Sequence, residues 1–530
     1  MRLYITQFKN KYKIYIYGLL LISAILPALL SVKNIKISPD SMVYALISQE
    51  IISGNGIRLP IVYDMNDNYV FIDGTVPYVG EPPLLPIVFA LLGGVAPQSF
   101  FAAQILNVIS HTVISIFTFL LIRKLYDNKW IALLTGIIVS ISLPLLWNTH
   151  RMISEPLFIA LTVAALYFLI LSQRSYSHKS IRNLFVASIC TSAAILTRFA
   201  GIALIPVFFW AIFILVRNKN ITFKKILTIL TTILPLLTVG ALFIYTYIIA
   251  GSIHGWNPPS PERSVLEAVT VTIKMIFLQF DLGKRPIILI SIFMILFILF
   301  SVVNTNMRKE LLKYVHSGLD LITIFVISYT ALITYAMFKS QTVIEVRYMS
   351  PLVPFIFILY MLITIVIWEL IRIKGFSKLS LCWIILSLCI ITFGTCYKTY
   401  MKSAEIFSQD LGHYRILNSP TYKWIEGNYK KNVIITSNRP YHLSFLGGYS
   451  TIRLPHKRFE KNTPIPENTE AYLPERMSKF GSQVLALFEK ADEQYEGSYI
   501  AGLFNKRGDD ENFILIQKFP DGVVYQLKER

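Results

Sequence analysis

Two carboxylates in this sequence stand at the edges of long apolar stretches, where charged residues are rare. Asp40 follows Pro39 just past the first apolar stretch, and Glu155 opens a later one. Ionisable residues at the edge of a membrane-spanning segment are candidate functional groups by default. A carboxylate fixed at such a place can take the proton from an acceptor hydroxyl, which is general-base chemistry. We therefore treat Asp40 as a candidate base and Glu155 as its candidate catalytic partner.

Each carboxylate also has a purely structural interpretation. Asp40 precedes the amphipathic stretch Ser41–Ile52, so its position fits a helix N-cap, and the local pattern alone slightly favours that role. Glu155 would complement the partial positive charge of a helix amino terminus, with Ser154 as the cap. Neither interpretation excludes chemistry, because a capping carboxylate is also held in a fixed orientation.

Three arginines accompany the acids. Arg151 shortly precedes Glu155, Arg198 separates two apolar stretches, and Arg347 opens a segment rich in proline. The guanidinium group suits phosphate, because its planar fork of donors matches two phosphate oxygens at once. For Arg347, a simple pairing with Glu345 is the alternative interpretation.

The elements that must position these groups are mostly membrane helices. Of 530 residues, 54% are hydrophobic and 15% charged, whereas soluble domains carry ~25% charged residues. The mean hydropathy of +0.56 points the same way. Window hydropathy predicts about eleven transmembrane helices. The net charge of +19 lies mostly in short loops between them, which indicates membrane topology and not a nucleic-acid surface.

The basic loops predict an orientation in the cell membrane. We assign to the cytoplasm the loops 123–129, 174–182, 217–225, 308–313 and 372–378. This puts the amino terminus inside and the long tail outside. It also leaves two long outer loops, 32–98 and 251–285, of which the second contains an amphipathic stretch at Val265–Phe280 that fits an interfacial helix.

Beyond Lys402 the composition becomes that of a soluble domain, which divides the chain into 1–400 and 401–530. We expect a small extracytoplasmic α/β domain with a helix at Pro474–Tyr495. The expected strands are Val433–Thr436, Tyr499–Leu503, Phe513–Gln517 and Val523–Leu527. The segment Tyr441–Gly448 reads as a structural turn, with a loop over the active site as the alternative.

Five motifs in order carry a family resemblance. They are Asp40 followed by Tyr44, then Pro82-Pro83-Leu84, then Glu155 opening a span, then Thr197-Arg198-Phe199-Ala200-Gly201, and finally Arg347-Tyr348 with Pro351 and Pro354. Together they resemble the membrane glycosyltransferases with the C-type (GT-C) fold. The similarity is to the bacterial branch related to protein O-mannosyltransferases and to the aminoarabinose transferase of lipid A, and it covers roughly residues 1–400. Two positions depart from the family: Ser41 stands where many relatives have a second acid, and Glu81 stands where many have Lys.

The resemblance implies transfer of a sugar from a polyprenyl-phosphate donor to a hydroxyl of a lipid, glycan or protein on the outer face, with inversion. Asp40 would be the base, and Glu155 would orient the acceptor or the sugar. Contacts to the donor phosphate or substrate are assigned to Tyr44, Arg151, Arg198, Arg347 and Tyr348. No nucleotide-binding motif is needed, because the lipid phosphate is the leaving group. We expect no cofactor; a divalent metal is compatible with the acids, but no motif indicates one.

Other functions remain as alternatives. Proline-interrupted spans would suit a transporter or flippase, and the outer loops would suit a polymerase or ligase of surface polysaccharide. A membrane scaffold presenting the tail is a further alternative. The geometry distinguishes them: in an enzyme, Asp40, Glu155 and Arg347 should converge, whereas in a scaffold they should lie apart.

Overall fold

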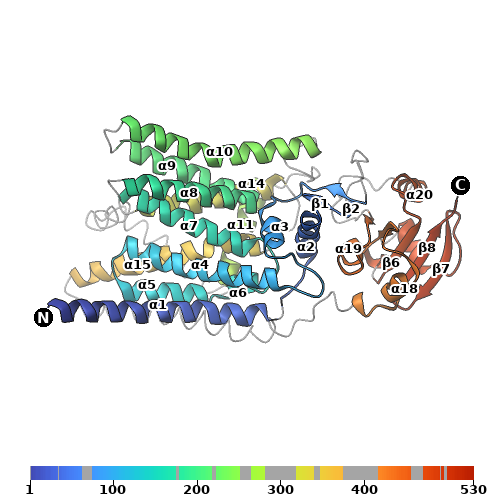
Figure 1. Cartoon of the computed structure of the whole chain (residues 1–530), viewed down its shortest axis with the longest axis horizontal. Coiled ribbons are helices and arrows are strands. Elements are labelled where there is room, and N and C mark those ends of the chain that lie inside the picture. The colour runs from blue at the N-terminus through green and yellow to red at the C-terminus, as the bar shows by residue number, and fades with distance from the viewer. Residues whose placement is uncertain are drawn as a thin grey trace.

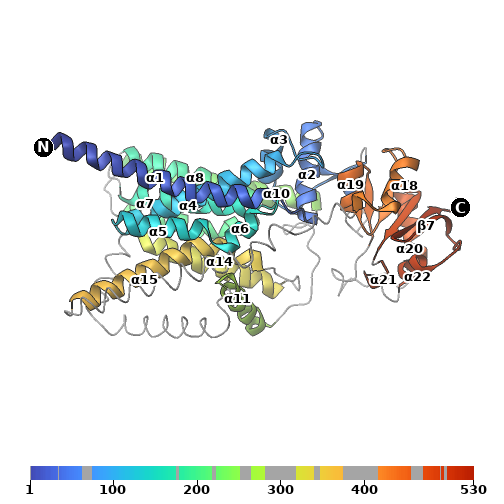
Figure 2. The ribbon, with the colours of Figure 1, turned by 90° about the horizontal axis from the view of Figure 1, so that it is seen from below.

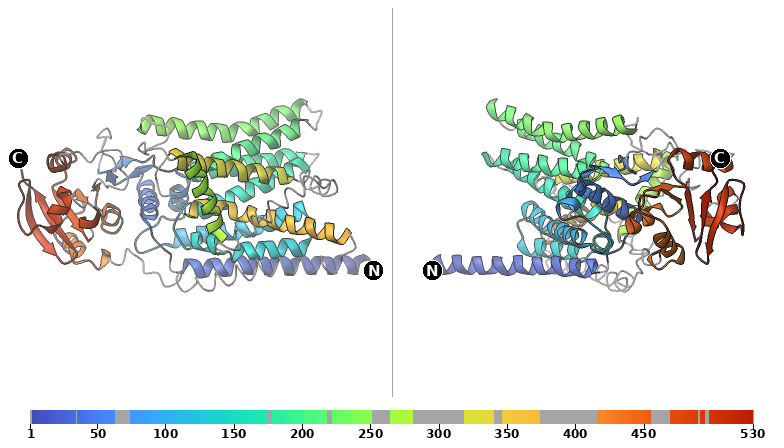
Figure 3. Two further views of the ribbon diagram at one scale, coloured as in Figure 1. Left: turned by 180° about the vertical axis from the view of Figure 1, so that it is seen from behind. Right: turned by 45° about the vertical axis from the view of Figure 1, so that its right-hand side comes forward.

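The computed structural model describes residues 2–33, 35–62, 74–174, 178–217, 222–250, 264–280, 318–339, 346–373, 416–454, 469–489, 491–494 and 498–529. Long helices run side by side and form one end of the molecule, and a mixed α/β region forms the other (Figure 1). The elements of the first outer loop lie between the two. The amino terminus is at the far end of the helical bundle from the carboxyl terminus (Figures 1 and 3).

The bundle contains the helices expected of a multi-pass membrane protein. They are α1 (Arg2–Val32), α4 (Phe101–Leu125), α5 (Lys129–Ser140), α6 (Leu143–Thr149), α7 (Glu155–Arg174), α8 (His178–Thr197), α9 (Leu204–Arg217), α10 (Thr222–Ala250), α14 (Asp320–Lys339) and α15 (Val353–Ile373). Within the described residues, 5 helices are long and apolar enough to cross a membrane, or 6 if the bent pair α5–α6 is one span. The expected eleven spans include segments outside these ranges, so that number stays a prediction.

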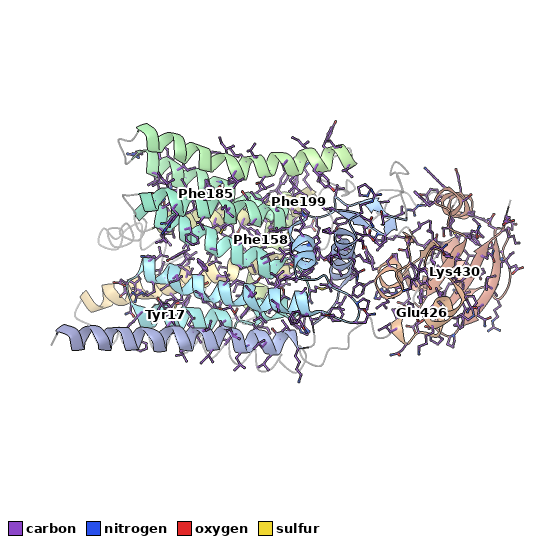
Figure 4. All side chains as sticks on the ribbon, viewed as in Figure 1. Tyr17, Phe158, Phe185, Phe199, Glu426 and Lys430 are labelled. Carbon is purple, nitrogen blue, oxygen red and sulfur yellow. The ribbon has the colours of Figure 1, made fainter. Side chains whose placement is uncertain are left out.

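The core of the bundle is apolar and extensive. Phe158 on α7 is fully buried between the helices, whereas Phe185 on α8 is half exposed on the outside of the bundle (Figure 4). Tyr17 of α1 packs its ring edge-on against Phe119 of α4, with the ring centroids 5.7 Å apart.

The chain breaks between α8 and α9, as expected at Arg198. Arg198 has extended backbone angles, and the short helix η1 (Phe199–Ala203) follows it. The amide of Gly201 donates to the Arg198 carbonyl at 2.8 Å. A side chain on Gly201 would come within 2.6 Å of the Ile195 nitrogen, so only glycine fits this close return of the chain. The Thr-Arg-x-x-Gly pattern therefore corresponds to a tight break between two helices, in which Arg198 has extended backbone angles.

At the outer end of the bundle lies a layer formed by the first outer loop. It consists of α2 (Pro39–Ile52), α3 (Leu84–Leu91) and a two-stranded antiparallel sheet of β1 (Arg58–Leu59) and β3 (Val76–Pro77). The N-cap of α2 is Ser38, which exchanges hydrogen bonds with Ser41 in a capping box. The interpretation of Asp40 as the cap is therefore wrong. Ser41 completes the capping box, so the Asp40 carboxylate is not needed to cap the helix.

The α/β region contains a six-stranded sheet in the order β2-β5-β4-β6-β8-β7. Its strands are β2 (Ile61–Val62), β4 (Ile435–Ser437), β5 (Thr451–Arg453), β6 (Val484–Phe488), β7 (Phe513–Phe519) and β8 (Gly522–Leu527). The strands β2, β5, β4 and β6 are parallel, and β8 and β7 continue the sheet antiparallel. Within the described residues, five helices lie around the sheet: α18 (Pro420–Asn428), α19 (Pro440–Gly447), α20 (Thr469–Lys479), α21 (Ala491–Gln494) and α22 (Tyr499–Asn505). The strand expected at Val433–Thr436 forms slightly later, and the last two strands are where the sequence predicts them.

Three expectations for the tail are wrong. The helix expected over Pro474–Tyr495 ends at Lys479 and gives way to β6, whose five residues are all buried. A strand buried on both faces is a continuous apolar run, which periodicity cannot tell from a buried helix. Tyr499–Leu503 is helical, because Ser498 caps it by accepting from the Ala501 amide. Tyr441–Gly448 is not a turn but mostly the helix α19 (Pro440–Gly447), which packs on α2.

The first outer loop and the tail share their cores. β2 comes from the first outer loop and extends the tail's sheet through parallel pairing with β5. Phe445 on α19 is buried in the same apolar cluster as Met42 and Tyr44 of α2. On the other side of the junction, Val62 and Ile452 share a smaller cluster. The tail therefore supports the layer that carries Asp40.

The second outer loop is partly described. Its amphipathic stretch forms the helix α11 (Val265–Phe280), which runs at a steep angle to the bundle helices (Figures 2 and 3). The rest of that loop, the predicted cytoplasmic loop 308–313 and most of loop 372–378 lie outside the described residues.

The shared core predicts that the tail stabilises α2. Phe445→Ala removes a large buried ring, which typically costs ~3–5 kcal/mol. We expect faster hydrogen exchange in α2 and β2, with little change in α4. Ile514→Ala is the matched control, because Ile514 lies on β7 of the same sheet and is 40% exposed. Unchanged protection of α2 in Phe445→Ala would show that the junction does not hold the helix.

Candidate active site

Four separate segments bring their charged side chains together at the outer end of the bundle. They are the start of α2, the start of α7, the break after α8, and the 3-10 helix η3 (Val346–Leu352). The central contact joins Arg347 Nη2 to Asp40 Oδ2 at 2.7 Å, across 307 positions of sequence. Arg347 thus pairs with Asp40. The alternative partner, Glu345, lies outside the described residues.

Glu155 lies between the two arginines. Its Oε1 is 2.9 Å from Arg198 Nη1 and 3.7 Å from Arg347 Nε. The Glu155 side chain is only 1% exposed, so its charge depends on these partners. A buried carboxylate between two guanidinium groups compensates their positive charges and fixes their separation. Asp40, Glu155 and Arg347 therefore converge, which is the arrangement expected of an enzyme and not of a scaffold.

Ser154 connects this network to α2. Arg198 Nη1 donates to Ser154 Oγ at 2.8 Å, and the Tyr44 hydroxyl donates to the same oxygen at 3.3 Å. The sequence assigns Ser154 only a capping role. In the structure its hydroxyl is a junction between an arginine and the tyrosine that follows Asp40 by one helical turn, so Tyr44 joins the site through it.

Tyr348 supplies an aromatic face to both arginines. The Arg198 guanidinium carbon is 5.2 Å from the Tyr348 ring centroid, and that of Arg347 is 5.3 Å away. Such cation–π contacts stabilise a guanidinium that has lost part of its hydration. The backbone of Tyr348 is held in turn, because its carbonyl accepts from the buried Tyr329 hydroxyl at 2.7 Å.

The helix η3 is pinned so that Arg347 reaches Asp40. Ser350 Oγ donates to the Arg347 carbonyl at 2.6 Å. Asn148 of α6 donates to the same Ser350 oxygen at 2.6 Å, which ties η3 to the bent α5–α6 pair. Pro351 has no amide hydrogen and interrupts regular helix here. The Arg-Tyr-x-x-Pro pattern therefore corresponds to a short segment that hydrogen bonds hold in place, and this segment carries Arg347 and Tyr348.

A third carboxyl group, Glu81, faces the same network from the loop before α3. Burial and, after it, the charge of Asp40 raise the pKa of Glu81 to about 8, against the opposing effect of Arg198. Glu155 also raises this pKa and Arg347 also lowers it, both more weakly. The folded protein therefore holds a proton that the unfolded chain releases, and this group makes stability fall as the pH rises towards about 8.

The tail also reaches this site. Burial raises the pKa of Tyr78, and the neighbouring Asp40 and Tyr441 act in the same direction. Tyr78 thus lies near both the candidate base and α19 of the tail. Arg453 Nη1 donates to the Tyr441 hydroxyl at 3.3 Å. The sequence does not predict that Tyr78 and Tyr441 lie near the site, because no local pattern connects these two positions.

Arg151 is placed differently from the other arginines. Its guanidinium carbon is 5.0 Å from the Trp147 ring centroid. Its backbone pairs with Lys36, and its carbonyl accepts from Asn107 Nδ2 at 2.7 Å. The described contacts of Arg151 thus hold the loop before α7 against the end of α1. Within the described residues, no group of 3 or more His, Cys, Asp or Glu is arranged to hold a metal ion.

Comparisons with known proteins agree with this fold. Residues 70–257 match the family model of dolichyl-phosphate-mannose-protein mannosyltransferase. The structure is similar to that of ArnT from Cupriavidus metallidurans in the apo state, with a TM-score of 0.55, 13% identity, and 98% of each chain covered. The structure of the same protein bound to undecaprenyl phosphate gives a TM-score of 0.54 at 11% identity over 98% of each chain.

The archaeal oligosaccharyltransferase AglB from Archaeoglobus fulgidus, solved with an inhibitory peptide and a dolichol-phosphate, is also similar. Its TM-score is 0.50 at 14% identity, covering 91% of this chain and 70% of that one. No curated protein sequence matches the chain significantly. The chain has the GT-C fold of membrane glycosyltransferases, and the expected fold class is confirmed.

The buried network predicts strong coupling between Glu155 and Arg198. Glu155→Gln leaves two guanidinium groups without their shared carboxylate and should destabilise the protein by ~3–5 kcal/mol. Adding Arg198→Gln removes part of the uncompensated charge, so the double variant should be more stable than the sum of the single effects. Thermal unfolding in detergent micelles measures each variant. Additive effects would contradict a direct pair.

The exposed pair Arg123–Asp127 provides the control. Its atoms are 3.1 Å apart, but the Asp127 side chain is 87% exposed. Solvent screens such a pair, so Asp127→Asn should leave thermal unfolding unchanged.

Proposed function

We propose that this chain, which has the GT-C fold, transfers a sugar from a polyprenyl-phosphate donor to an acceptor hydroxyl on the outer face of the membrane. The observation that carries the proposal is the contact between Arg347 and Asp40 at 2.7 Å, beside a second arginine, at one end of a membrane bundle. Two structural neighbours were solved with a polyprenyl phosphate, namely undecaprenyl phosphate in ArnT and dolichol-phosphate in AglB. The acceptor class is a lipid, glycan or protein.

The contact between Asp40 and Arg347 suits a base whose carboxylate becomes available only when this contact breaks. The Asp40 carboxylate is in contact with the Arg347 guanidinium at 2.7 Å, so this contact must loosen before Asp40 can accept a proton from an acceptor hydroxyl. A lipid phosphate competes for the same guanidinium, because phosphate also takes bidentate donors. Binding of the donor would therefore loosen Asp40 at the moment when the sugar arrives.

The transfer step balances in charge and atoms. The acceptor oxygen forms a bond to the anomeric carbon, and the hydroxyl proton passes to Asp40. The bond between the anomeric carbon and the phosphate oxygen breaks, and its electron pair stays on the lipid phosphate. Attack from the face opposite the leaving group inverts the anomeric configuration. Arg347 and Arg198 stabilise the charge that develops on the departing phosphate.

Glu155 has a positioning role in this proposal. It contacts both arginines and is almost fully buried, so its first effect is to hold the two guanidinium groups at a fixed spacing. The role that the resemblance implies, orienting the acceptor or the sugar, would need contact with substrate in addition. Tyr348 completes the phosphate site by covering both guanidinium groups on one side.

We place the protein in the cell membrane with its amino terminus in the cytoplasm and its tail outside. The basic residues Arg123 and Lys124 end α4, and Arg217 ends α9, whereas the candidate site lies at the opposite ends of these helices near the tail. The positive-inside rule then puts the site on the outer face. The whole tail would be extracytoplasmic.

The proposal predicts that Asp40→Asn abolishes transfer. The amide keeps the shape of the side chain but cannot accept the proton, so we expect a loss of about 10²–10⁴-fold in kcat. The consequence of this loss is measured in cells that lack the native gene and carry each variant, as the amount of each polyprenyl-phosphate-linked sugar by mass spectrometry. The unused donor should accumulate in Asp40→Asn cells as it does in deletion cells, and its mass identifies the sugar.

Glu50→Gln is the control for that experiment. Glu50 is on the same helix, and its carboxylate accepts from Asn55 Nδ2 at 2.7 Å at the exposed end, away from the network. It should behave as the wild type. Normal consumption of the donor in Asp40→Asn cells would rule out Asp40 as the base, and absence of any accumulating lipid-linked sugar in deletion cells would rule out the donor class.

A further inference from the structure

Two neighbours of Arg198 contact the same nitrogen atom of its guanidinium group. Arg198 Nη1 donates to Ser154 Oγ at 2.8 Å and lies 2.9 Å from Glu155 Oε1. Only the first contact is a hydrogen bond, because both carboxylate oxygens of Glu155 are buried without a hydrogen-bond partner among the described residues. The direction of the Arg198 N–H groups is therefore set by the serine, whereas Glu155 compensates the charge.

Ser154 does not use its hydroxyl as its place in the sequence predicts. A serine directly before a helix normally caps it by accepting from an amide of the first turn. In the part of the chain that the structure describes, no amide of α7 donates to Ser154 Oγ, and Pro156 has no amide hydrogen to give. The expected capping role of Ser154 is therefore wrong. Ser154 is fully buried, and the donors to its hydroxyl are Arg198 and Tyr44.

The remaining donors of Arg198 are available to a ligand. Its Nε and Nη2 atoms have no hydrogen-bond partner within the described ranges, and the side chain is 16% exposed. A phosphate binds best to two parallel donors of one guanidinium group. The edge formed by Nε and Nη2 can therefore receive the phosphate that the proposed mechanism assigns to this arginine.

We propose that Ser154 is a positioning residue that keeps this edge of Arg198 open for the donor phosphate. The inference rests on the proposed function and names the group that prepares its phosphate site. Because Ser154 accepts from Nη1, the guanidinium group does not turn a pair of N–H groups onto Glu155. Without the serine hydroxyl, Arg198 would close on the carboxylate as a bidentate pair, and donors that the phosphate needs would be used inside the protein.

The structure contains the driving force for that closure. A buried carboxylate that accepts no hydrogen bond is costly, and two parallel N–H···O bonds from arginine are among the strongest that a protein can form. Removing Ser154 Oγ would leave Nη1 without its acceptor beside two unsatisfied oxygens of Glu155. The arginine and the carboxylate would then satisfy each other. The serine thus holds the site in the conformation that binds, which favours the ligand.

Tyr44 fixes the serine from the opposite side. Its hydroxyl donates to Ser154 Oγ at 3.3 Å, and its ring is buried in the core of the outer layer together with Met42 and Phe445. The serine oxygen therefore accepts from α2 and from the break after α8. Closure of the outer layer on the bundle positions Ser154, and Ser154 in turn positions Arg198.

The test is the binding of undecaprenyl phosphate to the purified full-length protein in detergent micelles, measured by isothermal titration calorimetry. Ser154→Ala should raise Kd roughly tenfold or more, because the ligand loses hydrogen bonds from a charged donor. Ser154→Thr keeps a hydroxyl at the same place and should restore most of the affinity. Rescue by threonine is not expected if Ser154 only fills space, because threonine is the larger side chain.

Ser172→Ala is the matched control. Ser172 is equally buried on the same helix, but its hydroxyl donates to the Leu169 carbonyl near the opposite end of α7. The substitution removes a buried hydroxyl without touching the site, so the affinity for undecaprenyl phosphate should remain that of the wild type. Thermal unfolding of each variant is measured alongside. A role of Ser154 in packing alone would make the two alanine variants alike in binding as well as in unfolding.

A double variant tests whether Ser154 acts through Arg198. Arg198→Gln alone should weaken binding, because one of the two guanidinium groups is lost while Arg347 remains. Adding Ser154→Ala should then have no further effect, since the arginine that the serine orients is absent. A second, additive loss of affinity in the double variant would contradict the proposed role.

Wild-type affinity of Ser154→Ala would overturn the proposal, as would an equal loss of affinity in Ser154→Thr. Both results leave the proposed function intact, provided that the wild-type protein binds undecaprenyl phosphate. If the wild type does not bind it, the proposed donor class fails, and the role of Ser154 fails with it.

Discussion

The structure depends most on one constraint, the need to compensate the charges of two arginines in a mostly buried site at the edge of the helical bundle. Arg347 satisfies it through Asp40 at 2.7 Å and Glu155 at 3.7 Å, and Arg198 satisfies it through Glu155 at 2.9 Å. Desolvated charges are expensive unless they are paired and hydrogen-bonded. Because the partners come from distant segments, the network forms only when the outer layer has closed on the bundle.

The irregular segments of the fold follow from that constraint. A continuous α8–α9 helix would direct Arg198 according to helical periodicity, whereas the break at Gly201 frees it to reach Glu155. In η3, Ser350 and Asn148 replace regular helical bonding and fix the backbone that carries Arg347. Irregular backbone at membrane depth is tolerated where it is buried in protein or lines a cavity. These two breaks are therefore best understood as parts of the site.

Much of the site could be predicted from local residues, and its connections could not. Asp40, Glu155, Arg198 and Arg347 stand out because charges beside apolar stretches are rare. The partner of Arg347 could not be inferred, since a neighbour two residues away is locally as good as Asp40. In the tail, the sequence predicts helix where β6 forms, because a strand buried on both faces has no alternation to detect. The pairing of β2 with β5 was invisible for a related reason, since two residues of loop carry no strand pattern.

The arrangement also explains how the proposed phosphate-binding site would be stable before any phosphate arrives. Both guanidinium groups already have carboxylate partners, so neither is buried as an isolated charge. A phosphate must therefore exchange with a carboxylate, and its affinity reflects the difference between two ion pairs. The partner that can leave is Asp40, whose side chain is 40% exposed, whereas Glu155 is buried. In the proposed mechanism, exchange at Arg347 would release the exposed Asp40 and leave the buried Glu155 to hold the arginines. Occupancy of the proposed donor site would then be coupled to the availability of the base.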